Sequence, residues 1–357
     1  MISNCAVNEF EVIEVTNELP LNRLGGVGSV IDSLIDGFAT LGVPVLWYLT
    51  DHDYRIDDID LILAQFPNVA IGSMEEIKAL KAPIAHLHTY NHNPRILDYL
   101  KNKKSLFTIH SLLQREAESN GIDLSAEIER QERLVAACDA IVLVSEAELQ
   151  HYERLGYIAL NKNVRVIHNG LKNPPPTRWN AASKQLGFCG RLVPRKRPEY
   201  VQWILREKGF EEYCSLIAGR GFSAYSRDLV RDPMLQSRVH YLGWCGGKRL
   251  DAFYAAIELL VIPSTYEPFG MVALEAMARG IPIVCTRIDG LVEILGDNAI
   301  YAEDHSYYSF RHAMRQWLHT SSTTLGSMVQ AGQQRYVERF TDVIMADNYR
   351  TVFERLT

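Results

Sequence analysis

The sequence has no long apolar run, no paired-cysteine motif and no excess of basic residues. The 357 residues carry a formal net charge of −6, which argues against a polyanion-binding surface but allows a local site for a small anion. No apolar run reaches the roughly 20 residues that span a bilayer. The N-terminus also lacks a basic stretch followed by an apolar one. We therefore expect a cytoplasmic protein with no transmembrane segment and no nucleic-acid partner.

The six cysteines are scattered along the chain, and no two of them have Cys-x-x-Cys spacing. Several lie in apolar, strand-like runs, as reduced core residues of intracellular proteins do. Hydrophobic residues make up 47% of the chain and charged residues 22%, which are ordinary globular values. A chain of this length predicts two domains, each large enough to have its own core.

Short apolar runs alternate with helical patterns in both halves of the chain. This repetition predicts an α/β protein whose mostly parallel sheets are covered by helices on both faces. The turn signal Asn169-Gly170 and the stiff run Pro174-Pro175-Pro176 mark a boundary near residues 171–182. The predicted strands are residues 10–15, 43–49, 84–88, 106–109, 140–144, 164–167, 185–189, 216–218, 239–243, 259–263 and 282–285.

The stretch from Thr265 to Gly280 has a carboxylate on each side of a predicted loop–helix junction. Pro268 and Gly270 break the chain after a strand, and residues 272–278 read as a helix. Glu267 and Glu275 are eight residues apart. Both carboxylates can then face the crevice at the carboxyl end of a parallel sheet, where α/β folds bind ligands.

Two further loops have the composition of an anion site. Glycines 25, 26 and 28 open a predicted helix, so bare backbone amides could approach an anion; a tight turn is the alternative. Residues 191–197 include four basic side chains. They form either a solvated turn or a diphosphate clamp, with Arg191 as a bidentate fork and Lys196 as a point charge.

The run Glu-Pro-Phe-Gly-x3-Leu-Glu-Ala-Met-Ala from Glu267 to Ala278 resembles the Glu-x7-Glu motif of the family-four retaining glycosyltransferases of the GT-B fold. Matching elements follow in order from residue 25 to residue 295. The resemblance implies two Rossmann-like domains that face each other across a cleft. Residues 1–172 would bind the acceptor, with a helix at about 336–357 crossing back to them, and residues 180–335 would bind the nucleotide-sugar donor.

The resemblance also implies roles for individual residues. His110, Arg191, Lys196 and Glu267 would form the catalytic set, with the histidine near the C6 hydroxyl of the donor sugar. Glu267 would bind hydroxyls of that sugar, and Glu275 would bind the ribose hydroxyls. The complete donor-binding set is Gly25, Gly26, Gly28, Gly190, Arg191, Lys196, Gly219, Glu267, Phe269, Gly270, Met271, Val272 and Glu275.

The segment His86-Leu87-His88 suggests a metal site, but its apolar flanks and the lack of a nearby carboxylate argue against zinc. We interpret His86 as a packed core residue. By resemblance, His88 and Arg23 are candidate acceptor contacts. His92 either lines the acceptor cleft or is a plain loop residue. No Asp-x-Asp pair looks like a metal site next to a strand end. We interpret the pair at 51 and 53, which lies in a polar loop, as a solvated turn. The sequence therefore predicts no metal and no cofactor beyond the sugar nucleotide as co-substrate.

The function that the resemblance implies is retaining transfer of a hexosyl group from a nucleotide diphosphate sugar to an acceptor hydroxyl. A UDP-sugar is favoured as the donor, and a small soluble molecule or a saccharide as the acceptor. One alternative is a nucleotide-sugar epimerase of the same fold. Another is a catalytically silent regulator that binds sugar nucleotides. The base, the sugar, the acceptor and the oligomeric state stay open.

Overall fold

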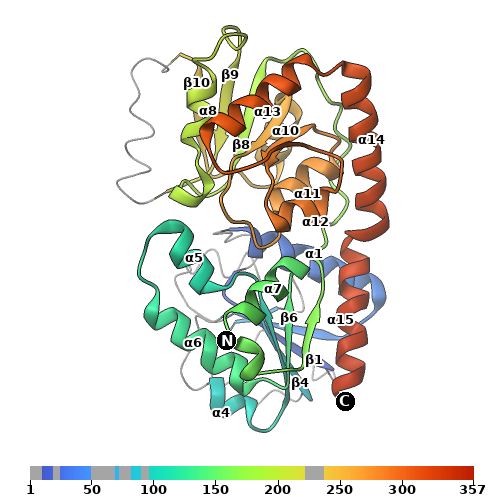
Figure 1. Cartoon of the computed structure of the whole chain (residues 1–357). Coiled ribbons are helices and arrows are strands. Elements are labelled where there is room, and N and C mark those ends of the chain that lie inside the picture. The colour runs from blue at the N-terminus through green and yellow to red at the C-terminus, as the bar shows by residue number, and fades with distance from the viewer. Residues whose placement is uncertain (1–9, 19–24, 50–68, 72–81, 90–95, 222–236) are drawn as a thin grey trace. The chain divides into compact units, whose positions relative to one another are not determined.

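The computed structural model describes residues 10–18, 25–49, 69–71, 82–89, 96–221 and 237–357 (Figure 1). The chain forms two compact units. The N-terminal unit comprises Met1–Ala117, Ile122–Lys172 and Asp342–Thr357, and the C-terminal unit comprises Glu118–Gly121 and Asn173–Thr341. Among the described residues, no helix combines the length and the apolarity needed to cross a bilayer.

The N-terminal unit is built on a seven-stranded sheet in the order β3-β2-β1-β4-β5-β6-β7. Every strand pair in it is parallel. The strands are β1 (Val12–Thr16), β2 (Val45–Leu49), β3 (Val69–Ile71), β4 (Ile84–Leu87), β5 (Lys104–Ile109), β6 (Ala140–Leu143) and β7 (Val164–Val166). The helices are α1 (Gly26–Leu41), α4 (Ile96–Leu100), α5 (Leu113–Asn120), α6 (Ser125–Ala137), α7 (Glu146–Arg154) and α15 (Asp342–Leu356), with a 3-10 turn η1 at Tyr157–Ala159.

The C-terminal unit repeats this plan with six parallel strands in the order β10-β9-β8-β11-β12-β13. The strands are β8 (Gln185–Cys189), β9 (Cys214–Ala218), β10 (Val239–Gly243), β11 (Leu259–Ile262), β12 (Ile283–Thr286) and β13 (Ile300–Ala302). The helices are α8 (Glu199–Ile204), α10 (Lys248–Ala256), α11 (Met271–Ala278), α12 (Asp289–Leu295), α13 (Tyr307–His319) and α14 (Ser322–Arg339), with a 3-10 turn η2 at Pro194–Lys196.

The central strands are buried along their whole length. Every residue of β1, β2, β11 and β12 is buried, which is the pattern of parallel strands covered by helices on both faces. The predicted α/β class with two parallel sheets is therefore confirmed. Among the buried polar side chains of these strands is the carboxylate of Glu14 in the middle of β1, whose exposed fraction is 0%.

The C-terminal segment differs from the single helix expected at about 336–357. The chain leaves helical geometry at Phe340, where φ is −130°, so α14 ends at Arg339 and α15 begins at Asp342. Helix α15 packs along α1 in the N-terminal unit, as expected for a helix that returns to the first domain (Figure 1). Gly37 makes this contact possible, because a Cβ there would lie 2.6 Å from the carbonyl oxygen of Asp342.

Both sheets have a point at which the strand order reverses. It lies between β1 and β4 in the N-terminal unit and between β8 and β11 in the C-terminal unit. The chains leaving two such strands turn to opposite faces of the sheet, so a crevice forms outside their carboxyl ends, where α/β proteins bind ligands. Within each unit, most of the candidate residues follow these strands or the strands next to them.

Candidate functional site

The loop after β8 contains the basic residues that the sequence singled out. Arg195, to which sequence analysis assigned no role, is 4% exposed and donates from Nη1 to the carbonyl oxygen of Tyr266 at 2.8 Å. Its guanidinium carbon also lies 5.8 Å from the centre of the Tyr266 ring. A solvated turn is therefore the wrong description of Arg195, because this side chain fixes the loop that carries Glu267.

Lys196 and Glu267 form a buried ion pair through Nζ and Oε1. Their side chains are 12% and 4% exposed, and Ser264 Oγ donates to the same carboxylate oxygen at 2.7 Å. Burial lowers the pKa of Lys196 to about 8, although the charge of Glu267 opposes this shift. Burial alone would raise the pKa of Glu267, but the charges of Lys196 and Arg195 outweigh it and lower that pKa. The structure thus joins two residues that were assigned to different parts of a donor.

Glu275 lies on α11 and is 6% exposed, so it is buried and does not lie on the solvent-facing side of the helix. Tyr254 of α10 donates its hydroxyl to Glu275 Oε2 at 2.8 Å. One turn further along, Arg279 pairs with Asp251 at 2.7 Å, and its guanidinium carbon lies 4.7 Å from the centre of the Tyr254 ring. These contacts hold the Glu275 carboxylate in one place.

The turns after β8 and β9 touch each other through their glycines. Gly219 has φ +153°, and a Cβ there would lie 1.8 Å from the carbonyl oxygen of Gly190. Gly270, with φ +101°, precedes α11, where a Cβ would lie 2.6 Å from a methyl carbon of Leu291. The approach of a backbone oxygen therefore requires glycine at 219, and the positive φ favours glycine at 270, whatever these turns bind.

The remaining members of the donor set lie at the start of α11. Phe269 is 2% exposed, and its ring packs edge-on against Phe340 at 6.1 Å between centroids. Met271 is buried and Val272 is half-buried. The Phe269 side chain therefore belongs to the core of the C-terminal unit.

At the start of α1, a carboxylate accepts hydrogen bonds from backbone amides that were expected to be free. The Gly25 and Gly28 N–H groups donate to Glu18 Oε2 at 3.3 and 2.9 Å. Gly26 is the first residue of the helix. The expectation of free amides is wrong for glycines 25 and 28, because the positive end of a helix favours any nearby anion and Glu18 supplies one. In the sequence, the acidic residue between the first strand and these glycines could have indicated that the amides have a partner within the chain.

Several sequence predictions lie outside the described residues. These are the acceptor candidates Arg23 and His92 and the loop pair Asp51 and Asp53.

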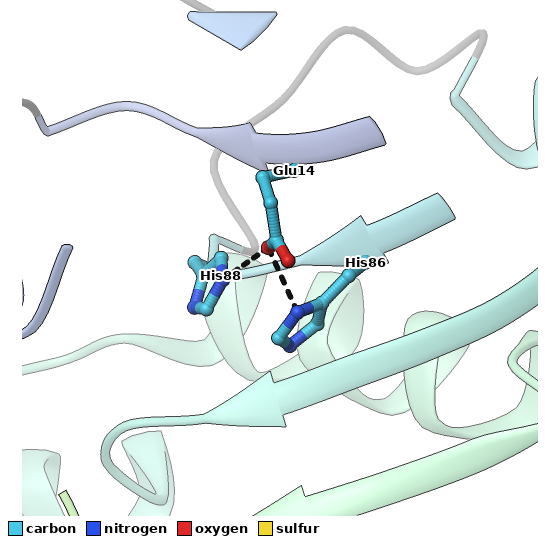
Figure 2. A group of neighbouring side chains, drawn as sticks. All are labelled: Glu14, His86 and His88. Carbon is cyan, nitrogen blue, oxygen red and sulfur yellow. Dashed lines mark hydrogen bonds and ion pairs between the residues drawn. The ribbon is translucent and has the colours of Figure 1, made fainter. Parts of the chain in front are cut away.

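A buried carboxylate–histidine cluster lies where β1 pairs with β4 (Figure 2). Glu14 is directly opposite His86 in the strand register. His88 Nε2 donates to Glu14 Oε2 at 2.7 Å, and His86 Nδ1 lies 2.8 Å from the same oxygen in a close electrostatic contact. The expected lack of a carboxylate near the histidines is therefore wrong, since strand pairing brings one from 72 residues earlier. In the sequence, the presence of a glutamate inside an apolar strand could have indicated this buried carboxylate.

The spacing within this cluster fits hydrogen bonds better than a metal. The possible ligand atoms of Glu14, His86 and His88 lie within 4.8 Å of one another. Tetrahedral zinc with bonds of about 2.0–2.1 Å separates its ligand atoms by about 3.3 Å. The contacts of 2.7 and 2.8 Å are shorter than that. His86 Nε2 also bonds to Thr108 Oγ1 at 2.7 Å, so its second nitrogen is engaged in the core.

His110 follows β5 and continues the chain of contacts. Its Nε2 lies 3.1 Å from His88 Nδ1, and the two rings stack with centroids 5.4 Å apart. Burial and the neighbouring His88 and His86 rings hold the pKa of His110 well below its usual value. The ring is therefore neutral near pH 7.

This cluster should make the N-terminal unit sensitive to acid. Burial lowers the pKa of His88 to about 4 from its usual 6.5. Its contribution to stability is therefore complete above pH 6.5 and is lost as the pH falls through about 4. For Glu14, the imidazoles outweigh burial and lower the pKa to about 2, so its contribution is lost only below about pH 4.5. Urea unfolding between pH 7 and pH 4.5 should show a decline approaching about 1.4 kcal/mol per pH unit. His88→Gln should have a shallower slope, and equal slopes would contradict this assignment.

Two models of glycosyltransferase families match this chain. The model for Glycosyltransferase Family 4 matches residues 24–172, and the model for Glycosyl transferases group 1 matches residues 171–335. An uncharacterized glycosyltransferase of Methanocaldococcus jannaschii, MJ1607, is 40% identical over 115 residues, which are 31% of this chain and 29% of that protein. Matches to the first curated relatives cover 29 to 44% of those proteins' own length.

Solved structures resemble the chain over almost its whole length. A sucrose-phosphate synthase from Thermosynechococcus elongatus has a TM-score of 0.79 at 16% identity, covering 98% of this chain and 99% of that one. Anabaena Alr3699/HepE, in complex with UDP and glucose, has a TM-score of 0.73 at 17% identity, covering 97% and 100%. At these identities the structures show the fold, and the two family models together account for residues 24–335. The chain belongs to the family-four glycosyltransferases of the GT-B fold.

Proposed function

We propose that the protein is a retaining glycosyltransferase that moves a hexosyl group from a UDP-sugar to the hydroxyl of a small soluble or saccharide acceptor. The observation that carries this proposal is the buried Lys196–Glu267 pair after β8 and β11, at the point where the strand order reverses. A desolvated lysine and carboxylate at such a position are suited to a ligand that carries both charge and hydroxyls. The structural likeness to a protein that binds UDP and glucose supports the choice of donor.

The proposed chemistry follows from the charges. Breaking the anomeric C–O bond leaves growing negative charge on the diphosphate, so a fixed cation stabilises the transition state more than the ground state. We assign this role to Lys196 and Arg191. Glu267 then binds hydroxyls of the transferred sugar, and Glu275 binds the ribose diol, since a carboxylate can accept two hydrogen bonds.

The two units would have separate tasks. We assign the donor to residues 180–335 and the acceptor to residues 1–172. His88 is not retained as an acceptor contact, because its two ring nitrogens bond to Glu14 and His110. The cations of the Arg191–Arg197 loop supply positive charge, so we propose that transfer needs no metal. Free thiols at all five cysteines of the described chain support a reducing, cytoplasmic location.

A donor panel tests this function. UDP-, GDP- and ADP-glucose should be compared by thermal shift and then by release of the free nucleotide with glycerol, inositol or maltose as trial acceptors. UDP-glucose should raise the melting temperature, an acceptor should increase UDP release, and EDTA should change neither result. Interconversion of the free donor to another hexose without an acceptor would favour the epimerase. A thermal shift with no turnover on any acceptor or in hydrolysis would favour the silent regulator.

The pH profile of turnover tests the role of Lys196. Because its pKa is about 8, the ammonium loses its proton as the pH rises through that value, and kcat/KM should fall about tenfold per pH unit above it. Lys196→Arg keeps its charge at any accessible pH. The alkaline fall should therefore disappear in this variant, even if its maximal rate is lower. An unchanged alkaline limb in Lys196→Arg would assign that limb to another group.

A further inference from the structure

The segment Ser264–Glu267, which follows β11 in the C-terminal unit, is held in place by a series of hydrogen bonds. Thr286 of β12 donates its hydroxyl to the carbonyl oxygen of Ser264. The Thr265 N–H group donates to the Arg195 carbonyl oxygen at 2.8 Å, and the Arg195 guanidinium bonds to the next carbonyl along the segment. The backbone of this segment is therefore fixed by the fold itself.

The two carboxylate oxygens of Glu267 have different surroundings. Oε1 accepts a hydrogen bond from Ser264 Oγ at 2.7 Å and pairs with Lys196 Nζ. In the part of the chain that the structure describes, no hydrogen-bond donor contacts Oε2. Two donors thus hold one oxygen and leave the other able to accept from a ligand.

The two donors to Oε1 differ in how a ligand affects them. Lys196 carries a charge and three N–H groups, and its side chain is 12% exposed, so a diphosphate attracts it. Ser264 is uncharged and 0% exposed, and its single O–H is already given to Glu267. When Lys196 bonds to an anion, the serine hydroxyl is therefore the contact with Glu267 that stays the same.

We propose that Ser264 is a positioning residue that keeps Glu267 Oε2 directed at a ligand while Lys196 bonds to the diphosphate. This inference rests on the proposed function for the identity of the ligand. Without the serine hydroxyl, Lys196 alone would hold Glu267, and the carboxylate would follow the ammonium towards the phosphates. Ser264 then acts through Glu267 on binding of the sugar part of the donor and has no effect on binding of the diphosphate.

Ser215 of β9 provides a matched control in the same unit. It is also 0% exposed, but its Oγ has no hydrogen-bond partner among the described residues. Ser215→Ala and Ser264→Ala therefore remove the same buried group, and only the second takes a donor from a carboxylate. Ser264→Cys fills the site with a weak S–H donor, so it repeats the loss without leaving a cavity if the alanine variant does not fold.

Calorimetry with UDP and with UDP-glucose is the direct test. Ser264→Ala and Ser264→Cys should each weaken UDP-glucose binding about three- to tenfold, the value of one hydrogen bond, and leave UDP binding unchanged. Ser215→Ala should match wild type with both ligands. Equal weakening of both ligands by the Ser264 variants would indicate a general structural role and would overturn the proposal. Unchanged binding of UDP-glucose would overturn it as well.

A double-mutant cycle shows whether Ser264 acts through Glu267. In a Glu267→Ala background there is no carboxylate to hold, so adding Ser264→Ala should change UDP-glucose binding by less than about twofold. An additional effect as large as that in wild type would contradict the proposal, because Ser264 would then act on the ligand by another route.

The same cycle in urea needs no ligand, so it separates this proposal from the proposed function. Ser264→Ala should lower the equilibrium constant for folding about ten- to hundredfold in wild type, the value of a hydrogen bond to a charged group, and much less in Glu267→Ala. If wild type binds neither nucleotide, the proposed function fails, while this coupling still shows that Ser264 holds Glu267. Equal losses in the two backgrounds would overturn the proposal even if UDP-glucose binds.

Discussion

Lys196→Met should lower kcat/KM for sugar transfer by about 100- to 1,000-fold, because it removes a fixed cation from the leaving diphosphate. The same change leaves the Glu267 carboxylate buried without its counter-charge. Breaking a buried pair from one side costs about 3–5 kcal/mol, so Lys196→Met should also be clearly less stable. Steady-state kinetics and urea unfolding measure the two effects separately.

Two variants show whether the loss of activity comes from charge or from unfolding. Lys196→Met combined with Glu267→Gln removes both charges, so it should recover most of the lost stability and none of the activity. Arg287 and Glu303 form an ion pair whose side chains are 44% and 69% exposed, so Arg287→Met should cost at most about 1 kcal/mol. A double variant that regained wild-type kcat/KM would remove Lys196 from the catalytic set.

Gly219→Ala should destabilise the C-terminal unit by about 3 kcal/mol or more and remove donor binding. Its Cβ would lie 1.8 Å from the Gly190 carbonyl oxygen, and a backbone atom cannot move aside without displacing the turn after β8. That turn leads into the Arg191–Arg197 loop, so the proposed diphosphate site should be lost with it. Tryptophan fluorescence during urea unfolding is a suitable measurement, since four of the five tryptophans lie between residues 179 and 317.

Gly243→Ala provides the matched comparison. Gly243 ends the neighbouring strand β10 and has φ +67°, but a Cβ there would meet nothing within 4 Å. Alanine at this position should therefore cost only the left-handed backbone conformation, about 1–2 kcal/mol. If the two alanine variants proved equally stable, the contact with Gly190 would not be what requires glycine at 219.

The sequence predicted most of the strands but few of their exact bounds. The bounds of β8 and β10 agree with prediction, whereas those of β1, β2 and β9 differ by two residues at one end or by one or two at both. Strands β3 and β13 have only three residues each and were missed. Contacts within one loop and helix, such as the stretch from Glu267 to Glu275, could likewise be identified from local pattern.

The missed site residues depend on contacts between distant parts of the chain. Glu14 meets His88 only because β1 and β4 pair, and Arg195 is buried only because its loop packs against Tyr266. In the sequence, Glu14 is visible only as a glutamate within an apolar strand, and Arg195 looks like an ordinary turn residue. Periodicity reports which side of an element is buried, but it does not report the neighbour on that side.

The packing of α15 on α1 has a consequence for biosynthesis. Helix α1 ends at Leu41 and α15 begins at Asp342, so the ribosome makes the whole C-terminal unit between these two partners. At a translation rate of about 5–20 residues per second, roughly 15 to 60 seconds pass between the synthesis of α1 and that of α15, which covers its apolar side. Residues 173–341 can complete their core first, although translation began with the other unit.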